Sequence, residues 1–256
     1  MEWQENSGNW VLIPSRPKAI IHFLGGAFVA TAPHVTYRCL LEILANQGYA
    51  VIATPFINTL DHLAIANNVL SSFENCLNHL YTSEILRKKS LPIYGIGHSM
   101  GCKLHLLMGS LNSIARAGNI LISFNNFGAR NAIPMVEQIS SVVKVEFTPS
   151  PKITNSIIQK RYQIRRNLLI KFNNDNIDQT LRLSDILRLR FPSMVTVQRL
   201  NGNHLTPLGQ DLSWSVGQVY TPVDAIGQWL KQEIYKDFNK LQREILLWLN
   251  PLAPIS

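Results

Sequence analysis

The sequence predicts an α/β fold in which a mostly parallel sheet is covered by helices on both faces. Along the 256 residues, short and almost continuously apolar segments alternate with longer segments whose apolar residues recur every three or four positions. The short segments are typical of strands buried on both faces, and the longer ones of amphipathic helices. Strands that alternate with helices favour a parallel sheet. Because 46% of the residues are hydrophobic, we expect one domain over residues 1–256 with a large core.

In the N-terminal half, the expected elements end at residues that interrupt regular structure. Gly25 and Gly26 follow the first strand, Gly48 follows the first helix and Pro55 follows the second strand. The elements expected in order are a strand at 18–24, a helix at 35–46, a strand at 49–54, a helix at 59–81, a strand at 91–97, a helix at 100–111 and a strand at 119–124.

In the C-terminal half, strands at 167–172 and 194–200 flank a helix at 180–189, and a helix at 223–249 closes the chain. The segment at about 125–166 interrupts the alternation, since it is longer than ordinary connections and contains Pro134, Pro149 and Pro151. It is also basic, with seven Lys or Arg against two Glu. Connections of this length are usually functional, so we expect a basic cap or lid there.

Charge and cysteine usage indicate the setting in which the protein works. A formal net charge of +8 favours acidic partners such as an anionic lipid or a negatively charged substrate. No nucleic-acid-reading motif accompanies the charge, so no nucleic-acid partner is expected. The cysteines Cys39, Cys76 and Cys102 are odd in number and widely spaced, which favours a reducing compartment. The N-terminus lacks the features of a secretory signal, so we expect a cytoplasmic protein, with peripheral contact at an anionic internal membrane left open.

A serine lies in the turn between an expected strand and an expected helix, in the segment Gly97-His98-Ser99-Met100-Gly101. Serine catalysis needs a hydroxyl exposed at a strand end, beside backbone N–H groups that can stabilise an oxyanion. The turn also needs small residues two positions before and after the serine, and Gly97 and Gly101 meet that need. We therefore predict that Ser99 is a nucleophile in a strand-to-helix elbow, with the N–H of Met100 as an oxyanion donor.

A rival interpretation of this turn is a dinucleotide-binding loop, because Gly95, Gly97 and Gly101 form a glycine-rich turn before a helix. Such a fingerprint normally lies in the first strand–helix unit, with an acidic residue about twenty positions later. Here the turn lies in the third unit, and the next strand is followed by Asn125 and Asn126. The position favours the nucleophile over NADP binding, so no cofactor is expected.

A serine nucleophile predicts an acid after a later strand and a histidine after the last one. His204 lies in a polar loop just after the last expected strand, where a general base can reach the nucleophile. The loop after the preceding strand offers two acids, Asp175 and Asp178. Asp175 lies three residues past the strand end and is favoured as the residue that orients His204. Asp178 is better placed to cap the next helix and stays the alternative acid.

The loop after the first strand is expected to supply the second oxyanion donor. Gly25 and Gly26 allow its backbone to turn toward the nucleophile, so that the N–H of Ala27 or of Gly26 points at the oxyanion.

Other polar residues near these loops have structural explanations at least as good as functional ones. His98 is expected to pack beneath the site, and Asp61 and His62 suit either a pocket rim or a helix end. Lys103 is too early in its helix to assign. No cluster of His, Cys, Asp and Glu has the spacing of a metal site.

With a glycine loop, elbow, acid and histidine in this order, the chain resembles the α/β-hydrolase superfamily. The segments Phe23 to Val29, Thr54 to Phe56 with Asp61-His62, and Gly97 to Leu106 resemble more narrowly an uncharacterised hydrolase-like family of cyanobacteria and plastids. The resemblance implies the α/β-hydrolase fold, to which the basic cap would be an insertion, and a Ser99, Asp175, His204 triad. It implies no substrate. Many esterases carry a His-Gly pair where this chain has Gly25 to Ala27, which leaves the oxyanion donor open.

The first functional hypothesis is hydrolysis of an ester or thioester, in the manner of an esterase, thioesterase or lipase. An acidic or lipid acyl substrate suits the basic cap, and acyl transfer to another alcohol shares the first half of the reaction. The second hypothesis is a hydrolase fold retained as a non-catalytic binding or assembly factor that acts at an anionic membrane surface. It predicts a damaged triad, whereas the sequence offers a complete one.

Overall fold

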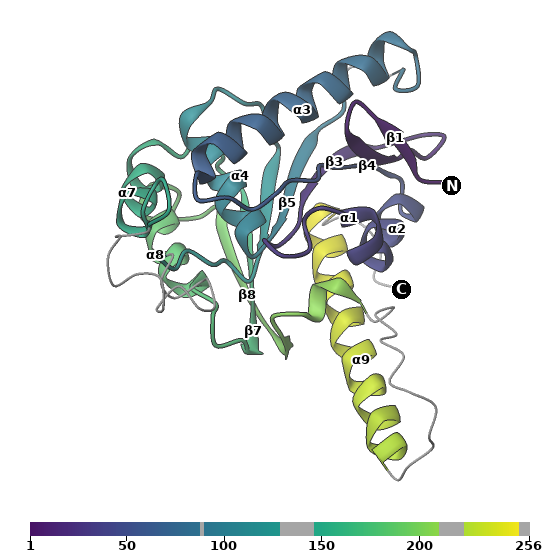
Figure 1. Ribbon diagram of the computed structural model, residues 1–256, viewed down its shortest axis with the longest axis vertical. Helices are drawn as coiled ribbons and strands as arrows, with labels where there is room; N and C mark the ends of the chain where they lie inside the picture. The colour runs from purple at the N-terminus through teal and green to yellow at the C-terminus, as the bar shows by residue number, and fades with distance from the viewer. Residues whose placement is uncertain (88–89, 129–145, 210–222, 251–256) are drawn as a thin grey trace.

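The structure is a computed structural model that describes residues 1–87, 90–128, 146–209 and 223–250, with the backbone alone for 223–235. Its centre is one eight-stranded sheet of order β1-β2-β4-β3-β5-β6-β7-β8 (Figure 1). The strands are β1 (Gln4–Asn6), β2 (Asn9–Leu12), β3 (Ala19–Leu24), β4 (Tyr49–Ala53), β5 (Ile93–His98), β6 (Gly118–Ile122), β7 (Asn167–Asn174) and β8 (Val195–Asn203). From β4 to β8 all neighbouring strands are parallel.

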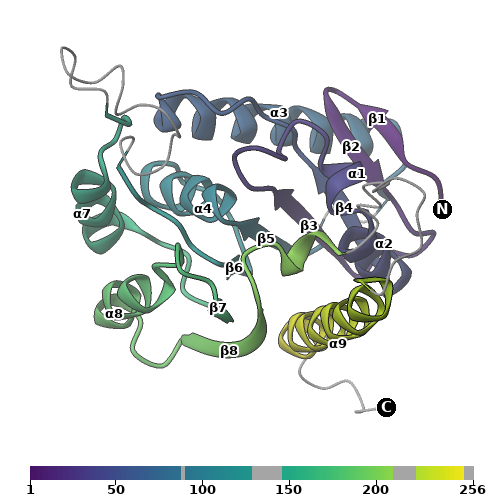
Figure 2. The ribbon, with the colours of Figure 1, turned by 60° about the horizontal axis from the view of Figure 1, so that its bottom comes forward.

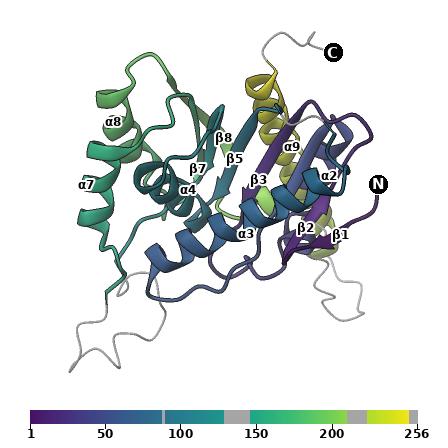
Figure 3. The ribbon, with the colours of Figure 1, turned by 90° about the horizontal axis from the view of Figure 1, so that it is seen from above.

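Helices cover the two faces of the sheet (Figures 2 and 3). On one face lie α1 (Pro33–Thr36), α2 (Arg38–Asn46), the 3-10 turn η1 (Thr206–Leu208) and α9 (Val223–Leu249). On the other lie α3 (His62–Thr82), α4 (Met100–Leu111), α7 (Pro151–Arg161) and α8 (Thr180–Arg190). Alternate residues of β3 enter different cores, since Ile21 and Phe23 pack under α2 while Ile20 packs under α3. The predicted α/β class and parallel sheet are confirmed.

The N-terminal strands were missed by sequence reasoning. β1 pairs with β2, and β2 pairs antiparallel with β4 through partners such as Val11 and Ile52. β1 and β2 are three and four residues long, too short to show a clear period. The turn between them places Ser7 and Gly8 at positive φ.

The C-terminal part of the segment expected as a cap at 125–166 forms α7, which packs in the helical layer. Ser150 accepts a hydrogen bond from the N–H of Ile153 and begins this helix, and Pro151 suits its first turn. Ile158 and Tyr162 are buried in the core shared with α4 and α8. Before α7, the backbone of Thr148 bonds to that of Leu60 and Leu63 at the start of α3. Residues 129–145 of the expected cap lie outside the described residues.

The ends of the parallel strands bring the candidate site residues to one edge of the sheet. Carboxyl ends of parallel strands are the usual ligand-binding edge of such folds. The glycine loop follows β3, Ser99 follows β5, Asp175 follows β7 and His204 follows β8. No helix in the described part of the chain combines the length and the apolar character needed to cross a bilayer.

Candidate active site

Ser99 occupies a strained turn between β5 and α4. Its backbone has φ 53° and ψ −115°, a conformation that residues other than glycine seldom adopt. The surrounding chain holds it there, since its N–H donates to the carbonyl oxygen of Ile122 over 2.9 Å and its own carbonyl accepts from Cys102. The strain is therefore maintained by β6 on one side and α4 on the other.

Both glycines of the turn are required by close backbone approach. A Cβ added at Gly97 would lie 2.6 Å from the backbone nitrogen of Cys102, and one at Gly101 would overlap the carbonyl oxygen of Leu24. Because Leu24 ends β3, the glycine at 101 lets α4 begin directly against the glycine loop. The sequence pattern thus corresponds to a real packing constraint at the elbow.

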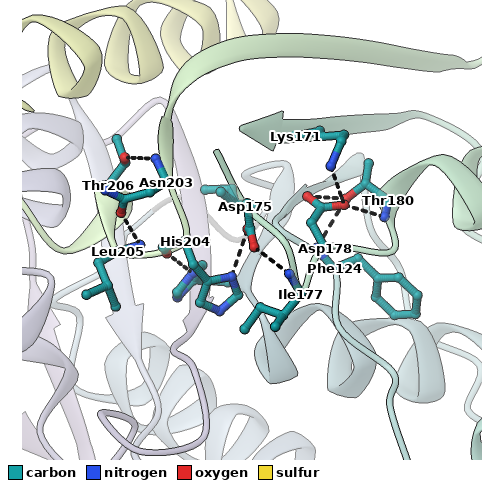
Figure 4. Close-up of polar contacts among 12 residues, drawn as sticks. Phe124, Lys171, Asp175, Ile177, Asp178, Thr180, Asn203, His204, Leu205 and Thr206 are labelled. Atoms are coloured by element: carbon teal, nitrogen blue, oxygen red, sulfur yellow. Dashed lines mark hydrogen bonds and ion pairs between the residues drawn. The ribbon is translucent and has the colours of Figure 1, made fainter. Parts of the chain in front are cut away.

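Asp175 and His204 are joined by a hydrogen bond of 2.8 Å between Oδ2 and Nδ1 (Figure 4). A carboxylate accepts hydrogen bonds, so Nδ1 carries the proton and Nε2 is left as an acceptor. Burial raises the pKa of Asp175, but the hydrogen bond and charge of His204, with the N–H of Ile177, bring it below its ordinary value. Asp175 is therefore ionised at neutral pH and sets the tautomer of His204.

The turn after β8 fixes the position of His204. Gly202 has φ 116°, and a Cβ there would lie 2.5 Å from Oγ1 of Thr206. That same oxygen accepts from the N–H of Asn203 over 2.9 Å, and Oδ1 of Asn203 accepts from the N–H of Leu205 (Figure 4). The polar residues on both sides of His204 thus form the turn that presents it.

Asp178 binds the start of α8, whereas Asp175 binds His204. Its carboxylate accepts from the N–H and the hydroxyl of Thr180, the first residue of α8, and lies 3.8 Å from Nζ of Lys171 (Figure 4). Burial raises the pKa of Asp178 despite these contacts. Of the two candidate acids, only Asp175 contacts His204 in the described part of the chain.

A chain of hydrogen bonds links the glycine loop to the histidine loop. The N–H of Gly26 donates to the hydroxyl oxygen of Tyr37 over 2.8 Å, and this hydroxyl lies 2.7 Å from Nδ1 of His98. At its other end, Nε2 of His98 lies 2.9 Å from the carbonyl oxygen of His204. A carbonyl oxygen can only accept, so Nε2 of His98 donates and Nδ1 accepts from Tyr37. Burial lowers the pKa of His98 to about 3, which keeps the ring neutral for this arrangement.

This series of hydrogen bonds narrows the choice of oxyanion donor in the glycine loop. It also includes Tyr37, a residue that sequence reasoning missed. Since the N–H of Gly26 is bonded to Tyr37, Ala27 remains as the candidate donor from the glycine loop. Met100 is the first residue of α4, so its N–H has no acceptor within the helix. His98 packs beneath the site as expected, with both of its nitrogens bonded. Tyr37 had no sequence signal, because its hydroxyl meets the elbow only in the fold.

Ser99 and His204 line one pocket of about 230 Å³. The apolar part of the lining comes from several segments of the chain. It includes Ala27, Phe28, Met100, Phe147, Ile177 and Leu208. The predicted cap contributes to this lining at Asn125, Asn126 and Phe127 as well as at Phe147. The volume lies below the roughly 300–1,000 Å³ of drug-sized ligand sites, so the pocket suits a small ligand group.

His62 and Lys103 also line the pocket. Both side chains are buried, at 4% and 1% exposure. Asp61, by contrast, accepts from the N–H of Ala64 and caps α3. His62 therefore lies at the pocket wall, and its neighbour Asp61 forms the helix end.

Residues 2–251 match the family described as "Protein of unknown function (DUF1350)". The chain belongs to this family. Its description gives no activity, and the expected source in cyanobacteria and plastids stays a prediction. No curated protein matches the sequence significantly.

Solved structures similar to this chain include several hydrolases. One is an esterase of the planctomycete Thermogutta terrifontis with butyrate bound, at 13% identity and TM-score 0.57 over 97% of this chain and 91% of that chain. Another is the fluorophosphonate-binding serine hydrolase F of Staphylococcus aureus, at 14% identity and TM-score 0.53 over 90% and 91%. A third is a thioesterase domain from the curacin biosynthetic pathway, at 13% identity and TM-score 0.50 over 82% and 95%. The likeness confirms the predicted α/β-hydrolase fold.

Proposed function

We propose that this protein is a serine hydrolase that cleaves an ester or thioester with Ser99, His204 and Asp175. The observation that carries the proposal is the 2.8 Å bond between Asp175 and His204, a histidine that lines the same pocket as Ser99 in its strained elbow. Similarity to an esterase, a serine hydrolase and a thioesterase supports the same class.

In the proposed reaction, Oγ of Ser99 attacks the acyl carbonyl while Nε2 of His204 takes the serine proton. The ionised Asp175 stabilises the protonated imidazole. The N–H groups of Met100 and Ala27 stabilise the oxyanion, and the positive end of α4 adds to that effect. His204 then protonates the departing alcohol or thiol, leaving an acyl group on Ser99. Water, deprotonated by His204, releases the acid and restores the serine.

The first test is labelling of the pure protein with a fluorophosphonate probe. We expect labelling of the wild type, none in Ser99→Ala and at least about hundredfold slower labelling in His204→Ala. The matched control is Ser110→Ala, because Ser110 lies on the same helix α4 with its hydroxyl bonded to the carbonyl of Leu106. It should label at the wild-type rate.

Absence of labelling in folded wild type would require a second trial with small p-nitrophenyl esters, which need less room in the pocket. If these are not hydrolysed either, the hydrolase proposal fails, and the non-catalytic binding factor becomes the better hypothesis. Labelling that persists in Ser99→Ala would place the nucleophile elsewhere.

A further inference from the structure

A buried lysine lies in the same pocket as the proposed nucleophile. Lys103 is 1% exposed and lines the pocket together with Ser99 and His62. Burial lowers the pKa of its ammonium to about 8, against an opposing attraction from Glu146. The group is therefore mostly protonated at pH 7, so the pocket contains a buried positive charge.

Within the described residues, Lys103 has few close polar partners. An ammonium has three N–H donors. Lys103 donates to the carbonyl oxygen of Pro149 over 3.3 Å, and its Nζ lies 5.5 Å from the centre of the Phe147 ring. Among the described residues, no carboxylate comes within ion-pair distance of Nζ. Because an uncompensated buried charge is costly, such a group is usually paired. A ligand anion would supply the missing partner.

Three further side chains of the pocket, those of His62, Asn58 and Asn126, have polar atoms without partners in the described structure. The one in Asn126 is Oδ1, since its Nδ2 donates to Pro151 and Asn155. Neither Nδ1 nor Nε2 of His62 has a hydrogen-bond partner in the described structure, and the ring stacks on Phe147 at 4.2 Å. Burial, with the nearby charge of Lys103, lowers the pKa of His62 to about 3, so the neutral ring has one N–H to donate. Oδ1 of Asn58 is also unpartnered, and a 180° turn of that amide presents its NH₂ group instead.

The position of Lys103 relates it to the reacting atom. It lies four residues after Ser99, about one turn or 6 Å along α4. We propose that Lys103 and His62 bind a carboxylate on the acyl part of the substrate, so that the preferred substrates are monoesters or monothioesters of short dicarboxylic acids. This inference rests on the proposed hydrolase function for its reaction and on the pocket for its specificity.

The donors favour a carboxylate over a phosphate as the bound anion. One ammonium and one neutral imidazole N–H match the two oxygens of a carboxylate, whereas phosphate sites usually present several charged or bidentate donors. Met100 and Phe147 also line the pocket and provide apolar contacts for a short methylene chain. The pocket volume of about 230 Å³ fits this size.

The test compares charged and neutral substrates of the same shape. The charged set consists of the monoethyl esters of succinic, glutaric and adipic acids, and the neutral set replaces each free carboxylate by a carboxamide. We expect the wild type to show kcat/KM at least about tenfold higher for the best charged ester than for its carboxamide, as for a charge-assisted hydrogen bond.

Lys103→Met should lower this charged-to-neutral ratio by about tenfold or more, because methionine fills similar space without the charge. The matched control is Lys152→Met, which removes an exposed lysine on α7 and should leave the ratio unchanged. Thermal unfolding of both variants verifies that they fold. A ratio that is the same in wild type and Lys103→Met would overturn the assignment of Lys103.

A binding experiment separates failure of this inference from failure of the hydrolase proposal. Calorimetry on Ser99→Ala measures binding of monoethyl glutarate without turnover, and a Ser99→Ala, Lys103→Met double variant should bind it about tenfold more weakly. If fluorophosphonate labelling fails but this difference is seen, the anion subsite stands and the hydrolase proposal falls. If labelling succeeds but binding and ratio do not depend on Lys103, the subsite falls alone.

Discussion

Replacing Tyr37 by phenylalanine tests whether the chain of hydrogen bonds beneath the elbow holds the glycine loop. The Tyr37 hydroxyl is the only atom that this change removes, and it accepts from the N–H of Gly26 and donates to Nδ1 of His98. The ring is fully buried and packs at 4.7 Å from Phe23, a contact that phenylalanine preserves. Any effect therefore comes from the two lost hydrogen bonds.

The structure gives the size of the expected effect. Leaving a buried donor or acceptor unpaired costs about 1–3 kcal/mol, so two such groups predict a loss of about 2–6 kcal/mol in the free energy of unfolding. Gly26 directly precedes Ala27, the proposed oxyanion donor. If the glycine loop becomes free to turn, the N–H of Ala27 no longer points at the oxyanion. Loss of one oxyanion donor slows such a reaction about 100-fold.

The assay is the rate of fluorophosphonate labelling together with unfolding in denaturant. Tyr162→Phe is the matched control, because that hydroxyl is also buried and bridges two side chains, accepting from Asn119 over 2.7 Å and donating to Asn167 over 2.8 Å. It lies in the core between α4, α7 and α8, away from the pocket lining. We expect similar destabilisation of both variants, but slow labelling in Tyr37→Phe alone.

Equal labelling rates in the two variants would refute the reasoning, since they would show that the glycine loop keeps its position without the hydroxyl. Slow labelling in both would instead trace the effect to lost stability, and the same measurement at lower temperature would then restore the rate.

Three other perturbations have outcomes that the structure fixes. Gly101→Ala should cost at least about 2 kcal/mol of stability, because the new Cβ overlaps the carbonyl oxygen of Leu24, and an unchanged melting temperature would contradict this. Asp175→Asn should slow labelling at least about hundredfold, whereas Asp178→Asn should stay within about threefold, since only the first acid holds the imidazole. From pH 7.5 to 5.5 the free energy of unfolding should fall by at least about 4 kcal/mol, measured in urea, and the fully buried His22, whose pKa is also lowered, adds to this loss. Burial lowers the pKa of three histidines to about 3: His62, His98 and His105. Below pH 6.5 these histidines bind protons in the unfolded state but stay neutral in the folded state, so their contribution to stability is full above that pH and is lost as pH falls. A change under about 1 kcal/mol would contradict their burial.

The elements that sequence reasoning located well are those whose cause is local. The elbow was recognisable because the space around Ser99 admits only glycine at positions 97 and 101. This constraint produces a local pattern of two glycines, each two positions from the serine. The loops after β7 and β8 were found because parallel strands bring their carboxyl ends to one edge. The preference for Asp175 over Asp178 followed from the distance of each to the strand end and the helix start.

The parts that sequence reasoning missed depend on contacts between distant segments. Tyr37 was placed inside one continuous helix, whereas the structure ends α1 at Thr36 and begins α2 at Arg38, with Tyr37 between them. Its partner His98 is 61 positions away, so no local period could relate them. In the same way, Lys103 had no assignment from the sequence because only packing shows that its ammonium is buried at the pocket wall.

In the proposed mechanism, the position of α4 links reactivity and specificity. Its first residue would present the Met100 N–H to the oxyanion, and one turn later Lys103 places a positive charge in the same pocket. Both features favour negative charge, but at different stages: the N–H groups act on charge that develops during the reaction, whereas Lys103 acts on charge already present in the substrate. A carboxylate bound at Lys103 would orient the carbonyl toward Ser99 before any bond changes. Loss of Lys103 should therefore raise KM for charged esters more than it lowers kcat, whereas loss of the glycine-loop donor should lower kcat.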